Sequence, residues 1–131
     1  MSRLITTDEI RKLLDASMLV NGEVKPKMGY EAICACDMIS ELLSIMNEKQ
    51  RASREAILLT ALTNTQVIRA SETVDIHLVV FIRNKKPAPE TIELARSLGI
   101  TLMSTPFSMY KSCGILYGAN MRDVNEGMEM H

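Results

Sequence analysis

Apolar positions along the chain fall into short continuous runs and into runs with helical spacing, and the two kinds alternate. Thr6 and Glu9 have the spacing of a capping box, so a first helix is predicted over about residues 7–16. The clearest strand is IHLVVFIR at 76–83, whose branched apolar residues suit a central strand covered on both faces. Further strands are predicted at 18–20, 30–36, 56–60 and 100–104.

Helical patterns follow most of these strands. Helices are predicted at about 38–46 and 64–74, and another from Pro89 at its first position to a C-cap at Gly99. Thr105-Pro106 repeats the cap-then-proline signal and predicts a last helix, in which Gly114 permits close packing. The predicted packing face of that helix contains Phe107, Tyr110, Gly114 and Tyr117.

The alternation of strands and helices predicts an α/β protein, a layered α/β/α sandwich with a central, mostly parallel sheet of about five strands. Asn21-Gly22 tolerates the positive φ angles of a tight turn and is expected to end the first strand. The pattern stops after Gly118. We therefore expect one domain over residues 1–118, followed by a flexible Met-rich C-terminal tail at 119–131.

Composition narrows the class of protein further. Hydrophobic residues make up 47% of the 131 residues, enough for a continuous core without metals or disulfides. The formal net charge is −1, so the chain has no excess of basic residues, and we do not expect it to bind nucleic acid. The sequence has no signal-peptide layout and no apolar run long enough to span a membrane. We therefore expect a cytoplasmic protein that does not bind a membrane. The odd set Cys34, Cys36 and Cys113 predicts free thiols.

No catalytic or metal motif emerges from the residues. The chain has neither a GxxxxGK[ST] loop nor a GxSxG elbow, and its histidines are His77, in a buried-looking strand, and the terminal His131. Strand alternation places Cys34 and Cys36 on one face, but the second ligand pair of a zinc site is missing. We therefore expect no catalytic residues, no metal and no cofactor.

A small-ligand site is predicted from the fold class, at the carboxyl ends of the strands beside helix N-termini whose amides attract anions. Two of its residues, Asp37 and Thr105, are also good helix N-caps, and Arg83 and Asn84 also suit an exposed turn. The residues expected at this edge are Asp37, Thr60, Thr63, Asn64, Thr65, Arg83, Asn84, Ser104 and Thr105.

A family resemblance is carried mainly by residues 79–117, VVFIRNKKPAPETIELARSLGITLMSTPFSMYKSCGILY. The strand, the KP turn, the ETIELA helix and the final STP.SM...CG.LY pattern resemble the DRTGG domain family, and a looser likeness begins at Leu4. The resemblance implies a fold similar to the N-terminal domain of HPr kinase/phosphorylase and no established enzymatic activity. Family members occur alone, or joined to CBS pairs or phosphotransacetylase, and stand-alone members are often encoded near hydrogenase subunits.

The chain departs from the family in its eponymous motif. Where the family has Asp-Arg-x-Thr-Gly-Gly leading to a Tyr, this chain has EVKPKMGY, with Gly29 and Tyr30 in register with the end of the motif. Glu23 stands in for the acid. Lys25 and Lys27 either supply replacement charge to this motif-equivalent loop or are ordinary exposed lysines.

Three functions follow as hypotheses. The first is a non-catalytic regulatory or accessory domain, acting as a homodimer, that recognises a small anionic ligand such as a nucleotide or phosphate, or a partner protein. The second is a structural subunit of a hydrogenase or electron-transfer assembly, with the Met-rich tail ordering on its enzyme partner. The third, a phosphoryl- or acyl-transfer enzyme, rests on fold analogy alone.

Overall fold

The computed structural model describes residues 4–22, 29–46 and 55–125. Within these residues a sheet has the strand order β1-β5-β4-β3-β2-β6. The strands are β1 (Ser17–Val20), β2 (Ala32–Ala35), β3 (Ala56–Thr60), β4 (Leu78–Phe81), β5 (Thr101–Ser104) and β6 (Arg122–Asp123). The helices are α1 (Thr7–Leu13), α2 (Ile39–Met46), α4 (Thr65–Thr73), α5 (Pro89–Leu98) and α6 (Met109–Gly118).

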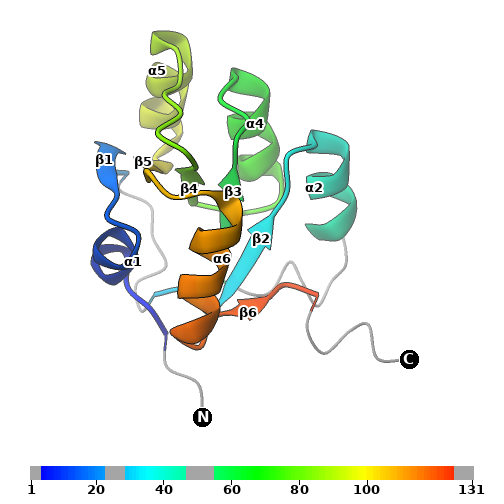
Figure 1. Cartoon of the computed structure of the whole chain (residues 1–131). Coiled ribbons are helices and arrows are strands. Elements are labelled where there is room, and N and C mark those ends of the chain that lie inside the picture. The colour runs from blue at the N-terminus through cyan, green and yellow to red at the C-terminus, as the bar shows by residue number, and fades with distance from the viewer. Residues whose placement is uncertain (1–3, 23–28, 47–54, 126–131) are drawn as a thin grey trace.

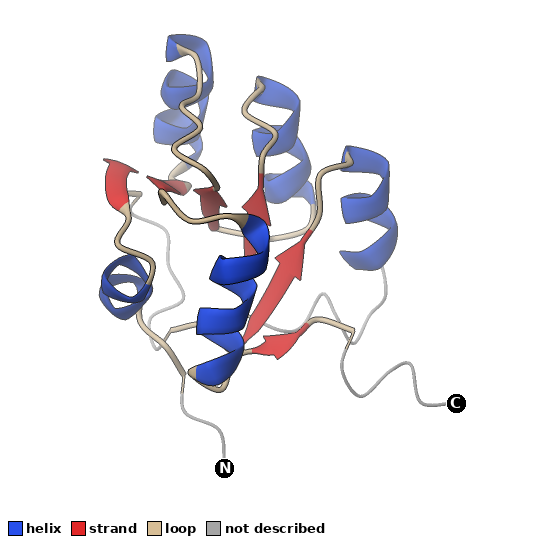
Figure 2. Ribbon diagram, viewed as in Figure 1, coloured by secondary structure: helices blue, strands red, loops and turns tan. Residues whose placement is uncertain are grey.

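The sheet is mostly parallel and carries helices on both faces, as the sequence predicted. Strands β2, β3, β4 and β5 are neighbours in chain order and pair in parallel, whereas β1 pairs antiparallel with β5. Because parallel crossovers are right-handed, the connecting helices α2, α4 and α5 lie on one face of the sheet. Helices α1 and α6 cover the other face (Figures 1 and 2). The predicted α/β/α sandwich is confirmed.

Two apolar clusters fill the space on either side of the sheet. Every residue of β3 and of β4 is buried, which confirms the predicted central strand. Alternate residues of these strands point to opposite faces, so Leu58 joins the cluster under α2, α4 and α5 while Ile57 joins the one under α1 and α6. Tyr30 is among the largest side chains with almost no exposure.

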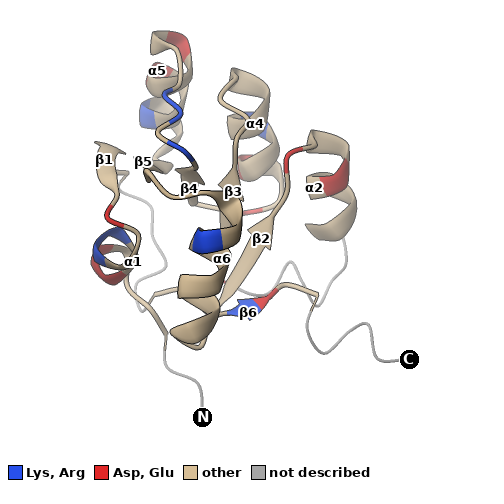
Figure 3. Ribbon diagram, in the orientation of Figure 1, with Lys and Arg blue, Asp and Glu red and all other residues tan. Residues whose placement is uncertain are grey.

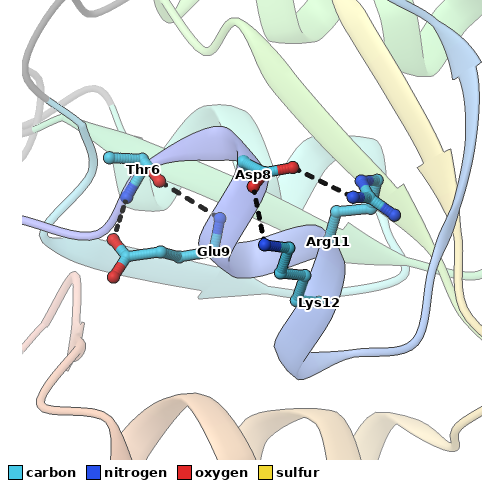
Figure 4. A network of polar contacts seen from close by, with 5 residues as sticks. All are labelled: Thr6, Asp8, Glu9, Arg11 and Lys12. Carbon is cyan, nitrogen blue, oxygen red and sulfur yellow. Dashed lines mark hydrogen bonds and ion pairs between the residues drawn. The ribbon is translucent and has the colours of Figure 1, made fainter.

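The predicted capping box at α1 is present (Figure 4). The Glu9 N–H donates to Thr6 Oγ1 at 3.1 Å, and the Thr6 N–H donates to Glu9 Oε1 at 2.9 Å. Arg11 and Lys12 contact Asp8 at 3.0 and 3.3 Å, and their hydrogen bonds and charges lower the pKa of that exposed carboxyl. The helix ends at Leu13, earlier than predicted, because the chain turns through a left-handed residue at Asp15 (φ 50°).

The predicted packing face of α6 is wrong. Tyr110 is 91% exposed, Tyr117 is 57% exposed, and no atom lies within 4 Å of a Cβ built on Gly114. The helix begins at Met109, and it buries Ser112 and Leu116 instead. Both sides of this helix carry apolar residues, so hydrophobicity alone did not identify the side that faces the sheet.

The tail predicted from residue 119 begins too early. Arg122–Asp123 forms β6, which pairs in parallel with β2, and the side chains of Met121 and Val124 are buried. Residues up to 125 therefore belong to the described fold, and the sheet has one strand more than predicted. Residues 126–131 lie outside the described residues.

Candidate functional site

The carboxyl ends of β4 and β5 are closed by bonds between the two loops that follow them. The Arg83 N–H donates to the Phe107 carbonyl at 2.9 Å, and the Asn84 N–H donates to the Thr105 carbonyl at 2.7 Å. Ser104 Oγ donates to the Lys85 carbonyl at 2.9 Å. The sequence predicted a ligand site at the carboxyl ends of the strands, and at β4 and β5 the following helices, α5 and α6, lie on opposite faces of the sheet (Figure 1). The two loops are instead joined to each other.

The buried hydroxyls at this edge are engaged inside the protein. Thr105 is fully buried, and its Oγ1 donates to the Leu14 carbonyl at 2.5 Å and accepts the Phe107 N–H at 3.2 Å. Thr105 is therefore not the cap of α6. That role belongs to Ser108, whose hydroxyl accepts the Lys111 N–H at 3.1 Å.

Asp37 also has a different role from the predicted one. Its Oδ1 accepts the Ala61 N–H at 2.7 Å and the Thr60 hydroxyl at 3.3 Å, so it holds the loop after β3 rather than capping α2. The Thr60 hydroxyl in turn accepts the Leu62 N–H at 3.1 Å. These bonds account for Thr60 although its side chain is fully buried.

The polar turn before α4 has structural roles as well. Asn64 caps α4 by accepting the Val67 N–H at 3.1 Å, Thr65 begins the helix, and the Thr63 carbonyl accepts the Thr91 hydroxyl at 3.0 Å. Arg83 and Asn84 differ from these residues because both side chains are exposed, on backbone with positive φ (52° and 57°).

Four basic residues gather around the joined loops, and we call them the cationic edge: Arg83, Lys85, Lys86 and Lys111. Lys111 Nζ lies 4.1 Å from the centre of the Phe107 ring, and the main chain of Arg83 donates its N–H to the Phe107 carbonyl, so both residues contact Phe107. Figure 3 shows basic positions on the β4–α5 connection and on α6. The first turn of α6 carries no acid, so its amide groups add positive potential here.

Only Arg83 of the cationic edge was predicted. A signal for two others was present, since Lys85 and Lys86 directly follow the clearest strand. Lys111 could not be placed from the sequence, because its position relative to the loop after β4 depends on the bonds that join this loop to Thr105 and Phe107.

A pocket of about 600 Å³ lies beyond the edge of β2, and we call it the edge pocket. No pattern in the sequence indicated this pocket. Its walls come from β2, α2, α6 and the segment around β6, and they are mostly apolar. The lining residues are Ile33, Cys34, Ala35, Glu41, Ile45, Tyr110, Cys113, Gly114, Tyr117, Asp123, Val124 and Asn125.

The cysteines are free thiols, as predicted, and two of them are neighbours. The sulfurs of Cys34 and Cys36 lie 4.0 Å apart. Their hydrogen bond, together with burial, raises the pKa of Cys34, whereas the same hydrogen bond lowers the pKa of Cys36. Burial raises the pKa of Cys113. Within residues 4–22, 29–46 and 55–125, no group of three or more His, Cys, Asp or Glu side chains could hold a metal ion.

His77 lies just before β4 rather than within a strand, and its Nε2 is 2.9 Å from Asp75 Oδ1. The motif-equivalent loop is described only at its end, because Glu23, Lys25 and Lys27 lie outside the described residues. Gly29 has φ 125°, and a Cβ there would meet the Ile5 carbonyl oxygen at 2.7 Å. Tyr30 exchanges two main-chain hydrogen bonds with Ile5, so this end of the loop anchors the N-terminal segment.

The described residues form an α/β fold, a mostly parallel sheet with helices on both faces, and this fold is similar to that of a solved regulatory region. The chain superposes with a TM-score of 0.62, at 19% identity, on the CBS and DRTGG domains of the regulatory region of Clostridium perfringens pyrophosphatase, solved in complex with its activator diadenosine tetraphosphate. The match covers 87% of this chain and 46% of that one, so this chain spans less than half its length. No family model and no curated protein matches the chain. Among the described helices, none is long and apolar enough to span a bilayer.

Proposed function

We propose that this chain is a non-catalytic regulatory domain of the DRTGG family that senses a nucleotide, whose phosphates bind at the cationic edge. The observation that carries the proposal is that the loop after β4, which carries three exposed cations, is bonded to the loop that leads into α6, whose first turn carries the exposed Lys111. Loops joined in this way hold the main chain that carries these side chains in place before a ligand binds, which reduces the backbone entropy lost on binding.

The ligand class follows from charge and from the structural neighbour. Arginine and lysine beside a helix N-terminus without acids favour a phosphate over a neutral ligand. The neighbouring regulatory region was solved with a dinucleoside polyphosphate activator. The buried hydroxyls of Thr60, Ser104 and Thr105 all form hydrogen bonds within the protein, where they hold loops together. They are therefore not available as nucleophiles, which supports a regulatory role.

Calorimetric titration with diadenosine tetraphosphate, ATP and inorganic phosphate tests the proposal. We expect ATP and diadenosine tetraphosphate to bind, with affinity falling as salt is raised, because screening weakens exposed charge pairs. Arg83→Gln and Lys111→Gln should each weaken binding by about tenfold, as expected for the loss of one charge-assisted hydrogen bond.

Arg96→Gln is the matched control, because it removes the same charge from the last turn of α5, where Arg96 is exposed and pairs with Glu93 at 3.8 Å. It should leave the affinity unchanged. Absence of heat with all three ligands, or an equal loss of affinity in Arg96→Gln, would overturn the proposal.

A further inference from the structure

We infer that the edge pocket binds the base and ribose of a purine nucleoside. This inference deepens the proposed function and rests on it for the choice of a nucleotide as ligand. Tyr110, which lines the pocket, directly precedes Lys111 of the cationic edge. A nucleoside in the pocket would contact the same first turn of α6 that carries Lys111.

At Ala35, which lines the pocket, the main chain has no bonding partner among the described residues on the β6 side. In a parallel ladder each residue turns its N–H and C=O toward one neighbouring strand, and successive residues alternate. The carbonyls of Glu31 and Ile33 each accept an N–H from the segment containing β6 at 3.0 Å, whereas the Cys36 N–H donates to β3 at 3.2 Å. Ala35 therefore turns both groups toward the β6 side, where no described main-chain group bonds to it.

A donor and an acceptor side by side match the edge of a purine base. Asparagine and glutamine amides read adenine in this way, by pairing with one ring nitrogen and the exocyclic amino group. The exposed Ala35 lines the pocket, so its main chain is accessible to such a ligand. A peptide strand suits this site less well, because β2 ends at Ala35 and a peptide would gain hydrogen bonds to that one residue only.

The α6 wall has the shape for a flat ring. Tyr110 and Tyr117 are both strongly exposed, and Gly114 lies between them on the same side of the helix. Nothing fills the space above Gly114 within 4 Å, which leaves a gap flanked by two phenol rings. Large aromatic side chains exposed beside an apolar pocket are typical of binding surfaces, and bases stack readily on them.

The polar groups at the pocket suit a ribose better than a phosphate. Glu41 and Asp123 are exposed carboxylates, and Asp123 Oδ1 already accepts the Asn125 N–H at 3.0 Å. Carboxylates beside nucleotide sites accept hydrogen bonds from ribose hydroxyls. Glu41 is assigned this role, and the negative charge of the two acids keeps phosphates outside the pocket.

Titration with adenosine, followed by calorimetry and by the amide NMR signals of Ala35 and Gly114, tests the inference. We expect adenosine to bind, to shift both signals, and to bind equally well at low and high salt because it carries no charge. Gly114→Leu should fill the gap and weaken the binding of adenosine and of ATP by more than tenfold.

Gly118→Leu is the matched control, since Gly118 is also an exposed glycine of α6 with nothing within 4 Å, but does not line the pocket. It should bind adenosine like the unmodified protein. Ala35→Pro removes the single N–H in question at an edge position that tolerates proline, and should weaken adenosine binding severalfold while thermal unfolding verifies the fold.

The outcomes separate this inference from the proposed function. If ATP binds, and Arg83→Gln weakens it but Gly114→Leu does not, the inference is overturned and the proposed function stands. If no nucleotide binds while adenosine still shifts Ala35 and Gly114, the pocket is a nucleoside site and the proposed function fails. If adenosine shifts neither signal, the inference is overturned.

Discussion

At the scale of single residues, the polar side chains at the carboxyl edge of the sheet do mainly structural work. Thr105 joins the loop after β5 to the end of α1 through the Leu14 carbonyl, and it also binds the Phe107 N–H. Asp37 performs a similar task between the loops after β2 and β3. Buried hydroxyls are tolerated only where they find such partners, because an unsatisfied buried polar group is costly.

Thr105→Val is expected to lower the free energy of unfolding by about 1–3 kcal/mol, because it leaves the Leu14 carbonyl and the Phe107 N–H without their partner. Thr105→Ser keeps the hydroxyl and should cost less. Urea unfolding of the two variants measures the difference. A loss in Thr105→Ser greater than that in Thr105→Val would show that the methyl group contributes more than the hydroxyl at this position.

The free energy of unfolding should decrease at alkaline pH because of the ionisation of Tyr30. Burial raises the pKa of Tyr30 above its ordinary value of 10.0. A raised folded pKa means that the unfolded chain ionises first, so this stability is fully present below pH 10 and is lost as the pH rises above it. In Tyr30→Phe the fall in unfolding free energy above pH 10 should be shallower, as measured by urea titration across pH 8–11. An unchanged slope would contradict this assignment.

The paired thiols predict a difference in reactivity. The hydrogen bond with Cys34 lowers the pKa of Cys36, and thiolates react faster than thiols. With limiting iodoacetamide near neutral pH, we expect Cys36 to be alkylated before Cys34, as read by mass spectrometry of peptides. Cys34→Ala should move the pH–rate profile of Cys36 to higher pH. A profile unaffected by that substitution would show that the bond does not control the thiolate.

At the scale of elements, two glycines have opposite surroundings: one lies where two segments approach closely, and the other faces open space. Asn21-Gly22 was predicted to end the first strand because it tolerates the positive φ angles of a tight turn, but neither residue has a positive φ. Gly22 is required for space, since a Cβ there would lie 2.2 Å from the Gly99 carbonyl oxygen, and its N–H donates to Thr101 Oγ1 at 3.0 Å. Gly114, for which close packing was predicted, faces open space.

Gly22→Ala should therefore lower the free energy of unfolding by about 1–3 kcal/mol, because the backbone around Gly99 must move to admit the methyl group. Gly114→Ala should raise it by about 0.5–1 kcal/mol, since alanine is the better residue inside a helix. Thermal and urea unfolding of both variants measure the contrast. A destabilised Gly114→Ala variant would contradict the open space seen beside α6.

At the scale of the whole molecule, the sheet is completed by a segment that follows the last helix. β6 pairs with Ala32 and Ile33 of β2, and beyond this short pairing no main-chain group of the described residues bonds to Ala35 on that side. The segment is anchored by Met121 and Val124, whose side chains are buried in the two different apolar clusters. The homodimer and the enzyme partner expected from the sequence stay predictions.

Met121→Ala should lower the free energy of unfolding by about 2–5 kcal/mol, as is usual when a buried methionine is truncated. Met38→Ala is the control, because Met38 is 60% exposed and its truncation should change stability by no more than about 0.5 kcal/mol. Urea unfolding compares the two. A small effect at Met121 would show that the β6 segment is held only weakly.

The sequence by itself determined the layers, the parallel core strands, the capping box of α1 and the C-cap at Gly99, because these depend on local periodicity and on the backbone preferences of single residues. Tertiary structure alone decided which side of α6 is exposed and which strand pairs with β6. It also decided that the loop carrying Arg83 is bonded to the loop before α6, and where the edge pocket lies. Each of these features depends on which segments, distant in sequence, lie side by side in the fold. Local sequence patterns do not determine that arrangement.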